Sequence, residues 1–198
     1  MEFSGLSHTI FKFPECQIIY SRLLEFDVII YTAGAGIQAN FNETTEAIYE
    51  LNSFIPIRLS NMLTLNNYKG KLLTFGSYFE IGNENNKRYY SENEIVASLN
   101  EAPNHYCASK RLLSKYLSSS PHTPFFFHLI LPNIYGKGEN SQRLIPYLVN
   151  TLKNNEDIKL TSGIQVRQYI HAKKIAKTDV DKKTERYQKG CKNLRQKK

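Results

Sequence analysis

The chain has 198 residues, 41% of them hydrophobic, which is enough for one domain of ordinary size with a real core. No apolar run approaches the length that crosses a bilayer, and the mixed N-terminus does not resemble a signal peptide. The cysteines, Cys16, Cys107 and Cys191, are odd in number and show no metal-ligand spacing, so we expect no metal and a reducing, cytoplasmic compartment.

The net charge of +8 is confined to the C-terminal end. Residues 172–198 hold 11 Lys and Arg against 3 Asp and Glu, which leaves 15 of each sign in residues 1–171. A basic run of this kind is typical of a solvated, disordered end. We therefore predict a neutral globular region, residues 1–171, and a basic, disordered tail, residues 172–198. We expect no membrane partner, and binding of nucleic acid by the tail is the weakest of the functional hypotheses.

Strands and helices alternate along the globular region. In chain order we expect a strand at 26–33, a helix at 44–65 interrupted by Pro56, a strand at 71–75, a long loop at 82–104, a helix at 106–117, a strand at 125–131, a loop at 132–140, a helix at 141–152 and strand-like pieces at 158–161 and 168–171. This alternation predicts βαβ units and an α/β fold with a mainly parallel sheet.

Tyr106 and Lys110 are four residues apart on a predicted helix, so they share one face. A nearby ammonium lowers the pKa of a phenol, which is about 10 in a free tyrosine, and so makes a general base for a sugar hydroxyl. The spacing alone is weak, because Tyr169 and Lys173 repeat it. The alternative for either pair is a partly buried tyrosine beside a surface lysine.

Context favours the first pair. Ser77 follows a strand, and a hydroxyl at the C-terminal edge of a parallel sheet faces the ligand crevice. The simpler interpretation of Ser77 is a turn or helix-capping residue. Two histidines near these segments receive no direct role: His105 points away from the face of Tyr106, and His128 is interpreted as a hydrogen-bonded core histidine.

Five segments, in order, resemble the extended short-chain dehydrogenase/reductases, the branch of NAD-dependent epimerases and dehydratases that act on sugar nucleotides. They are the strand and turn 27–34, the helix segment 49–52 with Asn52, the serine segment 76–82, the Tyr/Lys helix 103–110, and the loops 131–136 and 166–171. Each segment is loose by itself, but the order and spacing agree over about residues 26–176.

The resemblance implies that Tyr106 deprotonates a sugar hydroxyl while hydride passes to the nicotinamide of NAD or NADP. It further implies that Lys110 lowers the pKa of Tyr106 and holds the nicotinamide ribose, and that Ser77 hydrogen-bonds the reacting oxygen. The remaining implied site residues are Ala33, Gly34 and Asn52 against the cofactor, and Asn133 and Arg167 against the nucleotide-sugar substrate. The implied role is oxidoreduction of a nucleotide sugar in surface-polysaccharide synthesis. Dehydratases of the family carry two acidic residues after the serine, whereas Tyr78 and Phe79 stand here.

The glycine-rich strand–turn–helix that begins the family is not found before Phe26. The one literal G-x-G-x-x-A, formed by Gly34, Gly36 and Ala39, is interpreted as the turn after the fourth strand, with a primary phosphate loop as the alternative. We therefore predict a partial Rossmann-like, doubly wound parallel sheet that lacks its first βαβ unit and is truncated at both ends. The alternative to an enzyme is an inactive remnant, or a subunit that joins a second chain or forms a homo-oligomer.

Overall fold

The computed structural model describes residues 7–12, 20–37, 43–84, 88–120, 126–160, 162 and 167–177. The chain forms two compact units, Met1–Leu131 and Pro132–Lys198, and each is described by itself. The prediction of one globular region over residues 1–171 with a tail from 172 stays a prediction.

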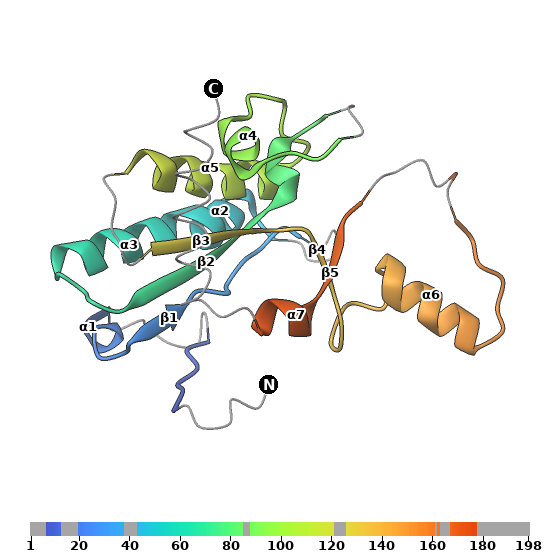
Figure 1. The fold of residues 1–198 in the computed structure, drawn as a ribbon, viewed down its shortest axis with the longest axis horizontal. Helices are drawn as coiled ribbons and strands as arrows, with labels where there is room; N and C mark the ends of the chain where they lie inside the picture. Colours follow the sequence, from blue (N-terminus) through green and yellow to red (C-terminus); the bar gives the residue numbers. More distant parts are fainter. Residues whose placement is uncertain are drawn as a thin grey trace. The chain divides into compact units, whose positions relative to one another are not determined.

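A parallel sheet forms the centre of the first unit (Figure 1). After the short helix α1 (Tyr20–Leu23), its strands are β1 (Val28–Ile30), β2 (Lys71–Ser77) and β3 (Phe126–Leu131), in the order β1-β2-β3. Leu72 is the residue opposite Ile29 on one side and opposite Phe126 on the other. The expected parallel α/β sheet is confirmed, although β1 is shorter than its apolar run and β2 continues through Ser77.

Helices cover one face of this sheet in Figure 1. They are α2 (Thr45–Tyr49), the π-helical turn η1 (Glu50–Phe54), α3 (Ile55–Leu65) and α5 (His105–Ser119). Leu59 and Leu63 of α3 pack with Leu72 in the core, all three nearly inaccessible to solvent. Burial of such side chains stabilises the layer by about 2 kcal/mol each.

Pro56 does not break its helix, contrary to expectation. It lies in the first turn of α3, directly after η1, so the missing N–H falls where the backbone pattern already changes. The carbonyl of Leu51 in this π-helical turn accepts a hydrogen bond from the Tyr31 hydroxyl at 2.7 Å. The helix therefore continues from α2 through η1 into α3, with a switch from π-helical to α-helical hydrogen bonding just before Pro56.

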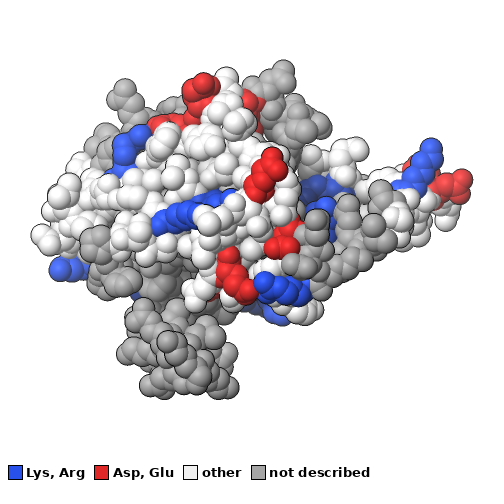
Figure 2. Space-filling model, turned by 90° about the horizontal axis from the view of Figure 1, so that it is seen from above, with Lys and Arg blue, Asp and Glu red and all other residues white. Residues whose placement is uncertain are grey.

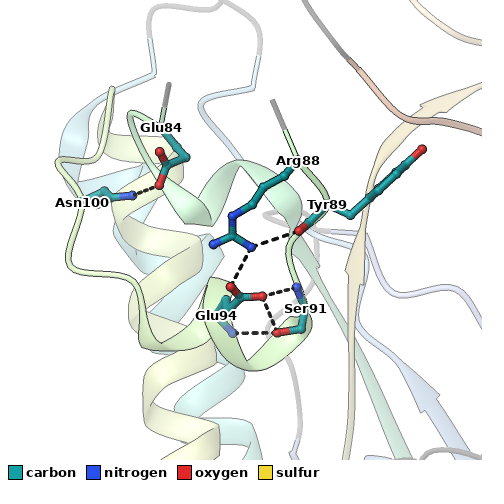
Figure 3. Close-up of polar contacts among 6 residues, drawn as sticks. All are labelled: Glu84, Arg88, Tyr89, Ser91, Glu94 and Asn100. Carbon is teal, nitrogen blue, oxygen red and sulfur yellow. Dashed lines mark hydrogen bonds and ion pairs between the residues drawn. The ribbon is translucent and has the colours of Figure 1, made fainter. Parts of the chain in front are cut away.

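The segment between β2 and α5 is more ordered than the predicted loop at 82–104. It contains η2 (Tyr78–Ile81), a 3₁₀ helix, and α4 (Glu92–Ala97). Figure 3 shows why α4 forms: Ser91 and Glu94 cap its first turn reciprocally, and Arg88 pairs with Glu94 at 2.8 Å. The side-chain amide of Asn100 donates to Glu84 at 3.2 Å and so links the two ends of this segment.

The second unit contains a two-stranded parallel sheet and two helices. Its elements are β4 (Asn133–Tyr135), α6 (Leu144–Lys153), β5 (Tyr169–His171) and α7 (Ala172–Ala176). Strand β4 lies inside the predicted loop at 132–140. It is three residues long and is defined by its pairing with β5, so no local sequence pattern predicted it. Residues 158–160 form no strand, while the prediction for Thr161 lies outside the described residues. Helix α7 occupies the start of the predicted tail, and residues 178–198 lie outside the described part.

Charged side chains are interspersed over the face shown in Figure 2, and no large patch of one sign forms there among the residues coloured by charge. In the part of the chain that the structure describes, every helix is too short or too polar to cross a membrane.

Candidate active site

The Tyr106–Lys110 pair lies on α5, as predicted. Asn104 caps this helix by accepting the N–H of Cys107 through its side-chain oxygen at 2.9 Å. Lys110 Nζ is 6.0 Å from the centroid of the Tyr106 ring. The other Tyr-x-x-x-Lys spacing spans two elements, with Tyr169 in β5 and Lys173 in α7, so only the first pair shares a helix face.

The ammonium group of Lys110 is held at the end of β2. Lys110 is only 8% exposed, and its Nζ donates to the carbonyl of Phe75 at 3.0 Å. Burial lowers the pKa of Lys110, and the carboxyl group of Glu80 opposes this shift. A cation fixed in this low-dielectric position stabilises a nearby phenolate more strongly than a solvated one would.

The turn after β1 reaches the same place. A methyl group added at Gly34 would lie 3.1 Å from the side-chain oxygen of Asn52 and 3.8 Å from Lys110 Nζ. Ala33 beside it is half-buried, and Gly34 itself is exposed. The structure thus brings Gly34 next to Asn52 and Lys110, and the place of Ala33 against a cofactor stays a prediction.

Asn52 ties this turn to the Tyr/Lys helix. Its amide is fully buried; the oxygen accepts the N–H of Ala35 at 3.1 Å, and the nitrogen donates to the carbonyl of Ala35 and to Ser109 Oγ, each at 2.9 Å. Ser53 adds a second link, donating to the Ser109 carbonyl at 2.6 Å. The amide of Asn52 therefore holds the walls of the site together, and direct contact with a cofactor stays a prediction.

Ser77 ends β2 and also begins η2. It is 7% exposed, its hydroxyl oxygen accepts the N–H of Phe79 at 3.4 Å, and its own N–H donates to Glu80 Oε1 at 2.6 Å. The position at the C-terminal edge of the sheet is as expected, and the simpler interpretation, a helix cap, also describes it. Its catalytic role stays a prediction.

A buried polar chain beneath Ser77 was missed by sequence reasoning. Glu80, fully buried, accepts a hydrogen bond from Ser114 Oγ; Ser114 lies 2.8 Å from His128 Nε2, and His128 Nδ1 lies 2.7 Å from Thr74 Oγ1. Burial, aided by the charge of Lys110, lowers the pKa of His128 to about 3, so the ring is neutral. His128 makes a hydrogen bond through each ring nitrogen, as interpreted, although by its accessible surface the residue is half-buried rather than in the core. The spacing Ser77-x-x-Glu80, a capping-box signature, is the signal that could have revealed Glu80.

Asn133 and Arg167, the predicted substrate-side residues, belong to the second unit. Asn133 opens β4, and its amide nitrogen donates to the carbonyl of Gln168 at 3.3 Å. Arg167 precedes β5. Because the two units are described separately, the membership of these residues in the site stays a prediction.

The fold and the Tyr106–Lys110 pair, in which Lys110 is buried and Tyr106 half-buried, define a Rossmann-like α/β protein with a Tyr–Lys site. The model of the NAD dependent epimerase/dehydratase family matches residues 12–178, and the chain belongs to this family. This confirms the resemblance seen in the sequence.

Relatives of known name agree with this assignment. The chain is 40% identical over 70 residues to the CDP-abequose synthase of Salmonella muenchen, an alignment covering 33% of this chain and 24% of that protein. Its fold is similar to that of UDP-N-acetylglucosamine 4-epimerase from Methanobrevibacter ruminantium M1, with a TM-score of 0.66, 22% identity, and coverage of 81% of this chain and 52% of that one. It is also similar to dTDP-glucose 4,6-dehydratase from Bacillus anthracis, with a TM-score of 0.55, 18% identity, and coverage of 74% and 44%.

These similarities differ in what they show and in how much of each relative they cover. At such low identity the two solved structures show the fold alone, and they confirm the partial Rossmann-like sheet. The chain spans about half the length of each solved structure and about a quarter of the curated relative.

Proposed function

We propose that the chain carries the catalytic part of an NAD(P)-dependent enzyme that oxidises a hydroxyl of a nucleotide sugar or reduces the corresponding keto group, in the synthesis of a surface polysaccharide. The observation that carries this proposal is the position of Lys110: it is buried, bonded to the end of β2, 6.0 Å from the Tyr106 ring and next to Gly34.

The residues present fit a nicotinamide cofactor. Because residue 34 is a glycine, Asn52 and Lys110 lie close to the turn: a methyl group there would be 3.1 Å from the Asn52 side-chain oxygen and 3.8 Å from Lys110 Nζ, and this holds Lys110 beside the backbone that would face the cofactor. Ala33 and Gly34 would form the wall, Asn52 would hold that wall in place, and Lys110 would donate to the ribose. When bound, the nicotinamide supplies or accepts the hydride.

Tyr106 supplies the acid–base chemistry in this proposal. Its phenolate takes the proton from the sugar hydroxyl that is oxidised, and its phenol returns a proton when a keto group is reduced. Lys110 makes the phenolate accessible near neutral pH by its charge. Ser77, at the end of β2, would donate to the reacting oxygen.

The substrate class follows from the relatives, which are named for CDP-, UDP- and dTDP-linked sugars. Asn133 and Arg167 are the candidate contacts for the nucleotide. The branch of the family is narrowed by Tyr78 and Phe79, whose rings lie 4.3 Å apart where a dehydratase carries acidic residues. Epimerisation and keto-sugar reduction are therefore favoured over dehydration.

Turnover tests the proposal. The full chain would be incubated with a panel of CDP-, UDP- and dTDP-sugars and NAD⁺ or NADP⁺, and with their 4-keto derivatives and NADH or NADPH, with products read by mass spectrometry. We expect conversion of at least one sugar and a loss of about 100-fold or more in Tyr106→Phe. A folded chain that converts none of them would contradict the proposal.

An association is part of the proposal. Strand β1 is an edge strand of the described sheet, and its residues Val28 and Ile30 are 46% and 51% exposed. In a homo-oligomer, or in a complex with a second chain, this apolar surface would be covered. Light scattering that shows only a monomer, alone and with candidate partner chains, would contradict this. We place the enzyme in the cytoplasm, where a buried free thiol such as that of Cys107 stays reduced.

A further inference from the structure

We propose that Glu80 is a positioning residue of the proposed active site: its buried carboxylate fixes the backbone of Ser77 and, through Ser114, fixes the tautomer of His128. This inference rests on the proposed function for its catalytic meaning, and on the hydrogen-bonded chain beneath Ser77 for its structure. We call this chain of Glu80, Ser114, His128 and Thr74 the Glu80 chain.

The carboxyl group of Glu80 has two donors and no solvent. Oε1 accepts the N–H of Ser77 at 2.6 Å, Oε2 accepts the hydroxyl of Ser114, and the side chain is fully buried. Both oxygens act as acceptors, which is the pattern of an ionised carboxylate. Burial raises the pKa of Glu80, and these two hydrogen bonds together with Lys110 and Arg111 oppose that shift.

The direction of every bond in the chain follows from this acceptor. Because Ser114 gives its proton to Glu80, its oxygen is left to accept from His128, so Nε2 of the ring carries the hydrogen. Nδ1 then has a lone pair, which accepts the hydroxyl proton of Thr74. One carboxylate on η2 thus fixes four groups on β2, α5 and β3: Ser77, Ser114, His128 and Thr74.

Gly76 shows how tightly the Glu80 chain lies against the strand. A methyl group added there would be 2.6 Å from Glu80 Oε1 and also 2.6 Å from His128 Nε2. The residue before Ser77 therefore has no side chain because the carboxylate and the imidazole occupy its place. The carboxylate and the imidazole therefore lie directly against the backbone of β2 beside Ser77.

The same carboxylate acts on Lys110. Burial lowers the pKa of Lys110 and the negative charge of Glu80 opposes the shift, so Glu80 helps to keep the ammonium group charged beside Tyr106. Arg111 on the same helix donates to the backbone carbonyl of Glu80 at 2.6 Å. Glu80 thus supports both members of the proposed site that lie at the end of β2, Ser77 and Lys110.

The test replaces Glu80 by Gln, which keeps the shape and removes the charge. The amide oxygen can still accept the N–H of Ser77, but its NH₂ group must donate to Ser114, whose proton then turns to His128. We expect long-range ¹H–¹⁵N spectra to show the Nε2–H tautomer of His128 in the full-length chain and the Nδ1–H tautomer in Glu80→Gln. The matched control is Glu94→Gln, which alters the other capping box and should leave the spectrum unchanged. An identical His128 spectrum in Glu80→Gln would overturn the proposal.

Kinetics supply the catalytic arm. With the nucleotide sugar that the chain converts, we expect Glu80→Gln to lower kcat at least about tenfold with KM within about twofold, because Lys110 loses the nearby negative charge and the hydrogen bonds from Ser114 to Thr74 reverse their direction. An unchanged kcat would contradict the positioning role. A wild-type chain without any turnover would contradict the proposed function instead, and the His128 spectrum would still decide on the Glu80 chain.

If Glu80→Gln does not fold, Ser114→Ala provides the second variant. It cuts the link between Glu80 and His128 and leaves the bond to Ser77 in place. We expect His128 to lose its single tautomer in this variant. A His128 spectrum identical to that of the wild type would show that Ser114 does not transmit the effect of Glu80.

Discussion

Two capping boxes of the same form, Ser77-x-x-Glu80 and Ser91-x-x-Glu94, lie in opposite surroundings. In each, the serine caps a short helix and the glutamate accepts the serine N–H, at 2.6 Å in the first and 2.9 Å in the second. The first is buried under the site, whereas the second is at the surface and forms an ion pair with Arg88 (Figure 3).

The pKa values of the two glutamates shift in opposite directions because only Glu80 is buried. Desolvation raises the pKa of Glu80 despite its hydrogen bonds, while hydrogen bonds to Ser91 and then to Arg88 lower the pKa of Glu94 to about 2. A local sequence motif therefore sets the backbone geometry, and the tertiary surroundings decide whether the charge is a surface cap or a strained internal group.

The largest expected difference between the boxes is in stability. Glu80→Ala leaves the N–H of Ser77 and the hydroxyl of Ser114 without their acceptor in the interior, so we expect a loss of about 3 kcal/mol in the free energy of unfolding. Glu94→Ala, whose partners can turn to water, should change it far less. Urea denaturation followed by circular dichroism measures both, and equal losses in the two variants would refute the contrast.

The second prediction concerns the space around the buried box. Gly76→Ala would force a methyl group against Glu80 and His128, each 2.6 Å away, and we expect it to cost about 2 kcal/mol through overpacking. Gly34→Ala, where the nearest atom is 3.1 Å away, is the control with a smaller expected loss. Thermal melts of both variants compare them; if Gly76→Ala melts like the wild type, the Glu80 chain does not lie against the strand as described.

A third, smaller effect belongs to the exposed box. Ser91→Ala removes the side-chain acceptor for the N–H of Glu94, and loss of such a cap costs about 1 kcal/mol. Because α4 is short, we expect the loss to be local, as faster amide hydrogen exchange in residues 92–97. Faster exchange that extended equally through α5 would show instead that α4 and α5 unfold together.

The pH dependence gives the smallest effect and the clearest sign. A lowered folded pKa means that the contribution of Glu94 is present above its unfolded pKa near 4.5 and is lost as the pH falls towards about 2. A raised folded pKa means that stability attributable to Glu80 falls as the pH rises above 4.5. The wild type compared with Glu94→Gln and Glu80→Gln, between pH 2.5 and 8, should show differences of opposite slope. Parallel curves would contradict the assigned surroundings.

Sequence patterns predicted the parts of the molecule that depend on local spacing. The parallel strands, the helix with Tyr106 and Lys110, and the place of Ser77 at a strand end all follow from periodicity and turns. The features that these patterns did not predict depend on contacts between distant segments. The Glu80 chain joins Thr74, Glu80, Ser114 and His128, and no local pattern shows that a carboxyl group and an imidazole share one hydroxyl.

Two further features, the contacts of Asn52 and strand β4, also depend on distant segments of the chain. The family resemblance assigns Asn52 to the cofactor, which stays a prediction, and no local pattern showed that its amide bonds to Ala35 and, 57 residues away, to Ser109. Strand β4 was missed because three residues beginning at Asn133 have no periodicity of their own and are defined by pairing with β5. Long-range partners, rather than residue types, decided both.

The central claim, that the chain holds a nicotinamide site built around Lys110, is tested most directly by calorimetric binding of NAD(H) and NADP(H) to the full chain. Lys110→Ala removes the ammonium group at the end of β2, and Lys115→Ala on the same helix is the matched control. The account predicts saturable binding that Lys110→Ala weakens by about tenfold or more and that Lys115→Ala leaves unchanged. A folded chain that binds neither cofactor, or binds equally well without Lys110, would contradict it.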